Sequence, residues 1–402
     1  MRLTAIYLSA PAKENIRGTS ALQYYLLKGQ DSNVEVVLYS FNNNRLSDEQ
    51  IREVEQELGV EIRLLKLPWW YRWLLRCHLL FFRVLMRYPF ANYITLPKRV
   101  VEEIKMQQPD MIWVNGEELS RIVNQFPGYS RIQIGPDVES LYYYRMMGQR
   151  FVMNNALNYW KCAMMYRKYA RLERSFCTDE NFTYYAVGEA DIAHLRQLNP
   201  QLRCAFLRHP HYEVAERALP IKFHQPKIRL LVAGQYNLYM QQTADEILDF
   251  IISLPSEKND MLKEHYTITF LGKGWEQHVS TLNSIGYNIT HIKFAPNYIE
   301  EIIKHDIQIT PITIGTGTKG KVLDALANGL LVLGTPYAFE NIAVEHGKSC
   351  IQWKHAKEVP DILKDIVNNI NHYEQIASAG RDSVLKEHNP AIISRELFSI
   401  LN

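Results

Sequence analysis

Cysteine is scarce in this 402-residue sequence, and it never occurs in the CxxC spacing that zinc sites and redox motifs use. The five cysteines are scattered and odd in number: Cys77, Cys162, Cys177, Cys204 and Cys350. This pattern argues against a disulfide framework and a structural zinc site, and it indicates a reducing compartment. His209 and His211 lie close together but have no third ligand nearby in the sequence, so we expect no metal site there.

An excess of charge of one sign is also lacking. Lys and Arg number 45 against 43 Asp and Glu, and the net charge of +2 gives no indication of a nucleic-acid partner. The N-terminal apolar run is short and ends at Pro11, so we interpret it as a first buried strand rather than a signal peptide. We therefore expect a cytoplasmic protein, with the inner face of the membrane as an additional location.

Short apolar runs alternate with amphipathic stretches along the chain. Its length exceeds that of a typical single core and predicts two domains. The hydrophobic content of 47% and the charged content of 22% are those of a globular protein. The apolar runs predict strands at 3–8, 34–40, 111–115, 131–134, 182–187, 228–233 and 266–271. With helical stretches such as 48–58 between them, they predict a doubly wound α/β fold.

The stretch 309–341 carries the strongest indication of a ligand site. An apolar strand meets a loop in which Gly315 and Gly317 allow a sharp turn and a close approach of the backbone to a ligand. The predicted elements that follow are an N-cap at Thr318, a helix over 319–328, a terminating Gly329 and a buried strand over 330–333.

The charged side chains of this stretch suit a nucleoside diphosphate. The first turn of a helix offers unpaired N–H groups and the positive end of the helix dipole, and Lys319 and Lys321 add positive charge. Asp324, one turn beyond Lys321, is placed to accept hydrogen bonds from a ribose. The structural alternative is a glycine turn needed for packing alone, with Lys321 and Asp324 as an i, i+3 surface pair.

The same stretch resembles the donor-site motif of the glycosyl transferases group 1, a family of retaining enzymes with the GT-B fold. The matching residues are Pro311, Gly315, Gly317, Thr318, Lys319, Lys321, Val322, Leu323, Asp324, Ala325, Leu326, Ala327 and Gly329. The family's two acidic positions fall on Thr316 and Asp324. The first carboxylate is therefore absent, and the second is shorter by one methylene group.

The resemblance implies the GT-B architecture, in which two doubly wound Rossmann-like domains face a cleft and a C-terminal helix crosses back to the first domain. The implied ranges are 1–218 for the acceptor-side domain, 219–386 for the nucleotide-sugar-binding domain and 387–402 for the returning helix. It also implies a hexosyltransferase of polysaccharide biosynthesis, which moves a sugar from a nucleotide diphosphate sugar to a hydroxyl of a glycan or lipid-linked acceptor with retention. Such a reaction requires no protein nucleophile, metal or other cofactor.

The family's other glycine-rich loops imply further donor contacts. The full implied donor site is Gly18, Gly234, Gln235, Asn237, Lys273, Gly315, Thr316, Gly317, Thr318, Lys319, Lys321 and Asp324. The resemblance assigns catalysis to Asp137, Lys321 and Asp324. Asp137 follows the predicted strand 131–134, where it acts on the acceptor hydroxyl or fixes the donor sugar; its structural alternative is to cap the next helix.

The segment between Glu61 and Glu102 contains no acidic residue and is rich in arginine and aromatics. If 69–88 forms one helix, its four arginines Arg72, Arg76, Arg83 and Arg87 fall within about 60° of one another. A membrane-spanning helix would bury each arginine at a cost of roughly 2.5 kcal/mol or more, so we expect an interfacial helix on an anionic membrane. The equally weighted alternative is a helix that packs its apolar face on the domain core.

Two other functions remain open from the sequence. One is a catalytically silent GT-B partner subunit, which Thr316 and the lack of a basic residue after Gly234 favour. The other, less favoured, is a nucleotide-sugar epimerase of the same architecture.

Overall fold

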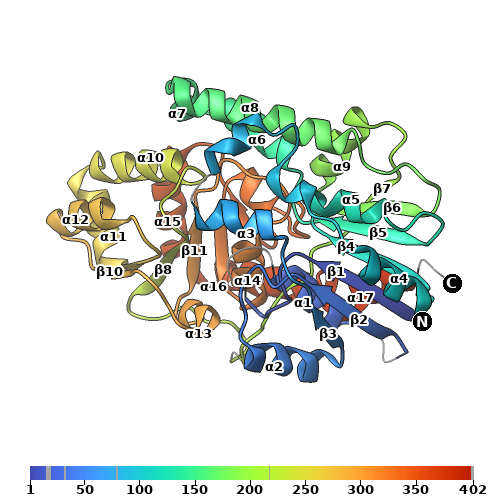
Figure 1. Ribbon diagram of the computed structural model, residues 1–402. Helices are drawn as coiled ribbons and strands as arrows, with labels where there is room; N and C mark the ends of the chain where they lie inside the picture. The colour runs from blue at the N-terminus through green and yellow to red at the C-terminus, as the bar shows by residue number, and fades with distance from the viewer. Residues whose placement is uncertain (15–19, 31–32, 78–79, 217, 400–402) are drawn as a thin grey trace. The chain divides into compact units, whose positions relative to one another are not determined.

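The computed structural model describes the chain apart from residues 15–19, 31–32, 78–79, 217 and 400–402 (Figure 1). Contacts divide the chain into two compact units, Met1–Pro210 with Pro390–Asn402, and His211–Asn389. The acceptor-side domain at 1–218, the nucleotide-sugar-binding domain at 219–386 and the returning helix at 387–402 stay predictions.

The first unit is built on a parallel sheet of seven strands in the order β3-β2-β1-β4-β5-β6-β7. These strands are β1 Arg2–Tyr7, β2 Glu35–Ser40, β3 Glu61–Leu64, β4 Met111–Asn115, β5 Arg131–Gly135, β6 Phe182–Ala186 and β7 Cys204–Phe206. Every residue of β4 and β5 is buried, as expected for central strands covered by helices on both faces.

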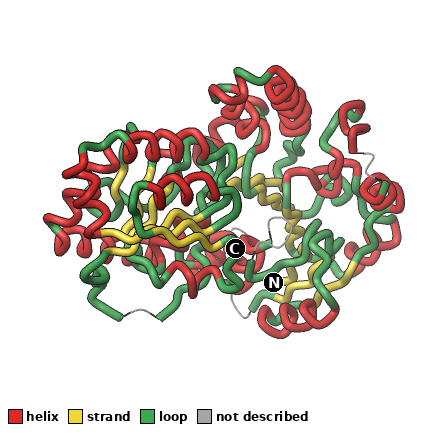
Figure 2. Tube along the Cα trace, turned by 90° about the vertical axis from the view of Figure 1, so that its left-hand side faces the viewer, coloured by secondary structure: helices red, strands yellow, loops and turns green. Residues whose placement is uncertain are grey.

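Helices flank this sheet (Figure 2). They are α1 Ala21–Lys28, α2 Asp48–Leu58, α3 Trp69–Arg76, α4 Lys98–Met106, α5 Ser120–Val123, α6 Glu139–Met147, α7 Arg150–Met153, α8 Ala156–Glu173, α9 Glu189–Leu198 and α17 Pro390–Ser399, with 3-10 turns η1 Leu80–Leu85, η2 Phe90–Tyr93 and η3 Glu117–Leu119. α2 has the predicted bounds, because Ser47 and Gln50 form a capping box at its start and Gly59 ends it in the left-handed conformation.

The second unit contains a parallel sheet of six strands in the order β10-β9-β8-β11-β12-β13. The strands are β8 Ile228–Ala233, β9 Tyr266–Leu271, β10 Ile289–Ile292, β11 Ile307–Thr310, β12 Leu331–Gly334 and β13 Ile351–Gln352. The helices are α10 Gln241–Ile252, α11 Ser256–His265, α12 Glu276–Ser284, α13 Tyr298–Ile302, α14 Gly320–Ala327, α15 Val359–Asn368 and α16 Ile370–Glu387, with 3-10 turns η4 Pro336–Phe339 and η5 Ala356–Glu358.

The strand order of both sheets reverses direction beside the first strand of each unit. In the first unit this switch point lies between β1 and β4, and in the second between β8 and β11. Ligands of doubly wound folds bind at such points, outside the carboxyl ends of the strands. The predicted doubly wound α/β fold is confirmed in both units.

The final helix, α17, belongs to the first unit. It packs against α1, where Ser394 Oγ donates to the carbonyl of Leu26 at 2.7 Å, and the rings of Phe398 and Trp113 lie 6.0 Å apart. The predicted return of the last helix to the N-terminal unit is therefore confirmed.

The acid-poor segment does not form one helix over 69–88. α3 ends at Arg76 and is followed by the 3-10 turn η1, so Arg83 and Arg87 do not continue the stripe of Arg72 and Arg76. The physical reason is tertiary. Lys168 of α8 donates to the carbonyl of Arg83, which a helix continuing to residue 88 would bond to the N–H of Arg87. Arg171 of α8 donates to the carbonyl of Arg87 and holds the end of the same segment.

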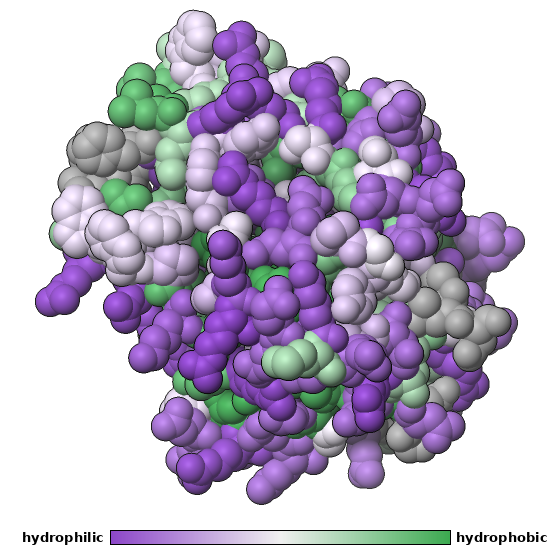
Figure 3. Space-filling view, turned by 45° about the vertical axis from the view of Figure 1, so that its right-hand side comes forward, coloured by the Kyte–Doolittle hydropathy of each residue, from purple (hydrophilic) through white to green (hydrophobic). Residues whose placement is uncertain are grey.

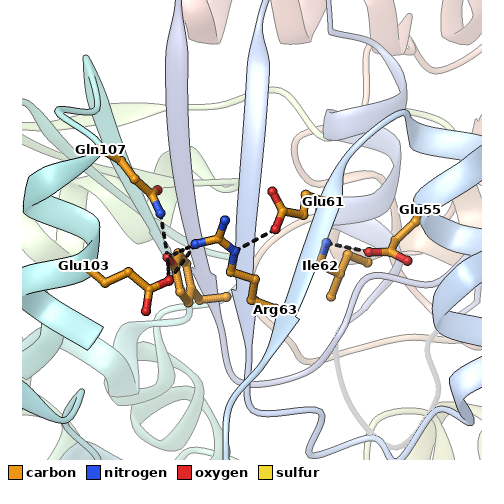
Figure 4. A network of polar contacts seen from close by, with 7 residues as sticks. Glu55, Glu61, Ile62, Arg63, Glu103 and Gln107 are labelled. Atoms are coloured by element: carbon orange, nitrogen blue, oxygen red, sulfur yellow. Dashed lines mark hydrogen bonds and ion pairs between the residues drawn. The ribbon is translucent and has the colours of Figure 1, made fainter. Parts of the chain in front are cut away.

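Arg63, at the start of the acid-poor segment, is held within the fold (Figure 4). It donates to Glu103 at 2.6 Å, to Glu61 at 2.7 Å and to the Tyr39 hydroxyl at 2.9 Å. The neighbouring Ile62 N–H donates to Glu55 at 2.8 Å. These bonds join β2, β3, α2 and α4, so Arg63 stabilises the packing of helices at this edge of the sheet.

Candidate functional site

The glycine-rich loop after β11 turns as the sequence predicts. Gly315 and Gly317 have φ angles of +147° and +58°, which other residues rarely adopt. The predicted N-cap was wrong, because Lys319 rather than Thr318 occupies that position and α14 begins at Gly320. The N–H groups of Val322 and Leu323 bond to the Lys319 carbonyl, at 2.9 and 3.1 Å, which places the helix start one residue later than expected.

Lys319 points back into its own loop. Its ammonium group donates to the carbonyls of Thr316 and Gly317, at 3.0 and 3.1 Å, and lies 3.7 Å from Glu340. Asn341 donates to the Gly317 carbonyl at 2.8 Å. Lys319 therefore holds the loop in shape, in addition to any charge that it offers to a ligand.

Lys321 points differently and remains exposed. A Cβ atom at Gly234, in the loop after β8, would lie 3.6 Å from its ammonium nitrogen. The same nitrogen lies 5.7 Å from the centre of the Tyr298 ring. Surrounding protein lowers the pKa of Lys321, and the charge of Asp324 opposes this shift. Lys321 thus brings a positive charge to the switch point between β8 and β11.

Asp324 lies one turn further along α14 and is buried, with 7% of its surface exposed. Among the described residues, its Oδ1 atom has no hydrogen-bond partner, and neither has the buried hydroxyl of Tyr298. Burial raises the pKa of Asp324 to about 7, while Lys321 opposes the rise. The site therefore holds a carboxyl group and a phenol, both buried with unused hydrogen-bonding capacity, beside a cation.

The loops after β8 and β9 contact each other closely. A Cβ at Gly272 would lie 2.2 Å from the Gly234 carbonyl oxygen, which accepts a 2.8 Å hydrogen bond from Trp275 Nε1. The Tyr236 N–H donates to the Lys273 carbonyl at 2.9 Å. This contact requires glycine at 272 and fixes the loop that faces Lys321, while the φ of +136° at position 234 favours glycine there.

The remaining donor candidates of this unit are placed as follows. The side chain of Asn237 accepts from the Tyr239 N–H at 3.2 Å, so it serves the turn before α10. Gln235 and Lys273 are exposed at the ends of the loops. Thr316 is 6% exposed within the loop that Lys319 holds. Gly18 lies outside the described residues.

Asp137 follows β5 in the first unit and is half-buried. The structural alternative was that Asp137 caps the next helix, but Val138 is the N-cap residue of α6. The N–H of Val138 donates to Asp191 at 2.9 Å. Burial, followed by the charge of Asp137, raises the pKa of Glu139 to about 8. Asp137 thus stands in a strongly acidic environment.

Buried carboxyl groups surround this position. Glu173 is completely buried, accepts hydrogen bonds from the N–H and hydroxyl of Ser140, and has a pKa raised to about 7 by burial. Burial, followed by the charge of Glu173, also raises the pKa of Glu117. Among the described residues, no group of His, Cys, Asp or Glu has the arrangement to hold a metal ion.

Sequence reasoning did not identify Tyr298 or the buried group around Glu173. Tyr298 begins α13, in a stretch whose residue pattern gives no signal of a ligand site. Its ring lies 5.7 Å from the ammonium nitrogen of Lys321, and the charge of Asp324 adds to the burial that raises its pKa. Only the tertiary structure shows that these residues lie close together, since they are distant in the sequence.

No protein-family model matches the chain, and no curated protein matches its sequence. Solved structures do match its fold. Anabaena HepE, solved in complex with UDP, has a TM-score of 0.61 at 10% identity, over 100% of this chain and 99% of that one. The sucrose-phosphate synthase of Thermosynechococcus elongatus has a TM-score of 0.64 at 10% identity, over 100% and 98%.

A third similar structure is that of WaaG, a glycosyltransferase involved in lipopolysaccharide biosynthesis, with a TM-score of 0.58 at 12% identity over the full length of both chains. The similarity extends over the whole of the chain in each case. Both units, with their sheets of seven and six parallel strands, match the GT-B glycosyltransferases. The chain thus has the two-domain α/β fold of GT-B glycosyltransferases.

Proposed function

We propose that this protein is a glycosyltransferase that moves a hexosyl group from a nucleotide diphosphate sugar to an acceptor hydroxyl with retention of configuration. The observation that carries the proposal is the placement of Lys321 and Asp324. Lys321, an exposed residue, and the buried carboxyl group of Asp324, whose Oδ1 has no partner among the described residues, lie together on α14. They stand at the switch point of the sheet, after a glycine-rich loop.

In the proposed reaction, the diphosphate binds the N–H groups at the start of α14 and the ammonium group of Lys321. Both stabilise the negative charge that develops on the leaving group, a purely electrostatic contribution. Asp324 accepts hydrogen bonds from the ribose hydroxyls. The acceptor hydroxyl attacks from the face that the leaving diphosphate occupies, so no protein nucleophile takes part.

Asp137 is proposed to act on the acceptor side, where it orients the attacking hydroxyl or holds the donor sugar. The acceptor is a glycan or a lipid-linked molecule, and the proposed site of action is the inner face of the membrane. UDP is the first nucleotide to test, because Anabaena HepE has been solved with UDP and with UDP-glucose.

The test is a thermal-shift series with UDP, GDP, ADP and CMP. A ligand at about 100 times its dissociation constant stabilises the folded state by about 2.7 kcal/mol, so one diphosphate should raise the unfolding temperature visibly. Lys321→Ala should abolish this rise. Lys304→Ala, which removes a lysine paired with Glu301 on the surface, is the matched control and should retain it.

Donor hydrolysis in the absence of an acceptor then separates an enzyme from a silent partner subunit. Slow release of the nucleotide by the wild type, lost in Lys321→Ala, supports turnover. Nucleotide binding without any release or transfer would favour the silent subunit, for which Thr316 in place of a carboxylate is the motivating feature. A folded protein that binds none of the nucleotides would contradict the donor site.

A further inference from the structure

A pocket of about 630 Å³ lies between the end of η1 and the helix α8; we call it the η1–α8 pocket. Its two walls are far apart in the sequence. Lys168 donates to the Arg83 carbonyl, and Arg171 donates to the Arg87 carbonyl at 2.9 Å, so the segment after α3 is fastened to α8. The volume is within the range of small-molecule sites.

The charged groups that line the η1–α8 pocket are all positive. They are Arg87, Lys161, Arg167, Lys168 and Arg171. No acidic side chain lines the pocket, and across the described part of the chain none of these five forms an ion pair. Burial, followed by the positive charge of Arg171, lowers the pKa of Lys168. An anion placed among these cations would relieve the repulsion between their charges.

The rim of the same pocket is apolar and open to solvent. Leu85 is 81% exposed, Trp160 is 69% exposed and Val84 is 57% exposed. Leu157, one turn before Lys161 on α8, is 83% exposed. Large apolar side chains grouped at the surface indicate an interaction site, and tryptophan next to arginine is typical of the boundary between lipid headgroups and acyl chains.

A second groove on α3 repeats this composition. It has a volume of about 650 Å³ and is lined by Trp69, Trp73, Arg45, Arg72 and Arg76, again without an acidic residue. In Figure 3, apolar and pale side chains gather at the upper left of a face that is otherwise mostly hydrophilic. Among the described helices, none is long and apolar enough to cross a membrane. Contact with a bilayer through such side chains would therefore be interfacial.

We propose that the η1–α8 pocket binds the phosphate group of an anionic phospholipid, while Leu85 and Trp160 enter the acyl boundary, so that this face of the first unit docks on an anionic bilayer. This proposal rests on the proposed function, which already includes action at the membrane. It adds the position of the headgroup site, which lies against α8 rather than on a single helix over 69–88. A soluble anion would account for the cations but not for the exposed apolar rim, which favours a lipid.

The test is flotation with vesicles of phosphatidylcholine alone and of phosphatidylcholine mixed with phosphatidylglycerol. The wild type should float with the mixed vesicles only. Lys161→Glu with Arg167→Glu should reduce the bound fraction about tenfold or more, since each basic residue near an anionic surface contributes about 1 kcal/mol. Both side chains are exposed, so the double variant should fold.

The control is Lys354→Glu with Lys364→Glu, which changes the net charge equally at exposed positions of the second unit and should retain flotation. Leu85→Ala with Trp160→Ala should weaken binding without any change of charge. An equal loss of flotation in both charge-reversed variants would mean general electrostatic attraction and would contradict binding at the pocket. A wild type that does not float with the mixed vesicles would contradict it as well.

A soluble ligand gives a different result. In that case, inorganic pyrophosphate would raise the unfolding temperature of the wild type. It would raise that of the Lys161→Glu, Arg167→Glu variant by less, and the wild type would not float with either kind of vesicle. That outcome would contradict the bilayer proposal. Flotation needs no nucleotide, so its failure is distinguishable from failure of the donor site.

Discussion

At the scale of single residues, the two lysines of the candidate donor loop have different surroundings. Lys319 is 10% exposed in its side chain and is bonded to the carbonyls of its own loop, whereas Lys321 is exposed and faces Gly234. Both carry the same charge, but only Lys321 is directed to the switch point. We therefore assign Lys319 chiefly to the shape of the loop and Lys321 to the ligand.

This difference predicts distinct defects in two alanine variants. In Lys319→Ala, amide hydrogen exchange of residues 315–319 should increase in the free protein, because the bonds to Thr316 and Gly317 are lost. In Lys321→Ala the exchange of this loop should stay unchanged, while nucleotide binding is lost. Equal exchange in both variants would contradict the assignment.

The buried Asp324 predicts a dependence of stability on pH. Its pKa is about 7 in the folded state and about 3.9 in an unfolded chain, so the folded state binds the additional proton between these values. Stability should therefore fall as the pH rises from about 4 to 7, by up to about 4 kcal/mol from this group. Below pH 4 the group is protonated in both states and contributes nothing to the dependence.

Asp324→Asn should remove this contribution. Its unfolding temperature should exceed that of the wild type by several degrees at pH 8, with little difference at pH 4. Asp382→Asn, at an exposed position on α16, is the control and should follow the wild type at both pH values. A constant difference between Asp324→Asn and the wild type across this range would show that Asp324 is ionised throughout.

At the scale of elements, α3 combines the two roles that the sequence left as alternatives. Tyr71 is 6% exposed and stacks on Phe90 at 4.4 Å between ring centres, whereas Trp69 and Trp73 are 72% and 51% exposed. One side of the short helix thus belongs to the core and the other offers aromatic and arginine side chains to solvent. A core helix and an interfacial helix are not exclusive here.

Tyr71→Ala should therefore lower the free energy of unfolding by about 3 kcal/mol, since it leaves a cavity beside Phe90. Trp73→Ala, the matched control on the same helix, should change it by less than about 0.5 kcal/mol. Urea unfolding followed by circular dichroism measures both. A large loss in Trp73→Ala would mean that this side chain is packed in solution.

At the scale of the whole molecule, α17 links the end of the chain to its beginning. A Cβ atom at Gly29, directly after α1, would lie 2.4 Å from the backbone oxygen of Pro390 and 2.7 Å from Ser394 Oγ. Because a backbone atom is among these neighbours, the clash is relieved only by moving the helix. Close packing of α17 on α1 thus requires glycine at position 29.

Gly29→Ala should lower the free energy of unfolding by about 1–3 kcal/mol and increase amide exchange in 390–399. Gly148→Ala, where the new atom would meet an ordinary contact of 3.4 Å, is the control and should leave both measurements close to those of the wild type. Normal exchange of α17 in Gly29→Ala would show that the helix does not depend on this contact.

Much of the fold and part of the site were predictable from local signals. Alternating apolar runs gave the strands, the Ser47 to Gly59 signals gave α2 its bounds, and Gly315 and Gly317 marked the turn after β11. The 3-10 conformation of η1 and the role of Tyr298 were not predictable. They depend on α8 and on α14, which lie far away in the sequence.

The sequence by itself determined the doubly wound pattern and the glycine-rich loop with its basic helix start, because strand alternation, helix caps and turn glycines act between neighbouring residues. Only the tertiary structure decided which lysine faces the switch point, that Asp324 is buried with an oxygen that has no partner among the described residues, and that cations of α8 join Arg87 in one pocket. Burial and charge proximity arise from packing between distant segments, and these two quantities set the chemistry of a site.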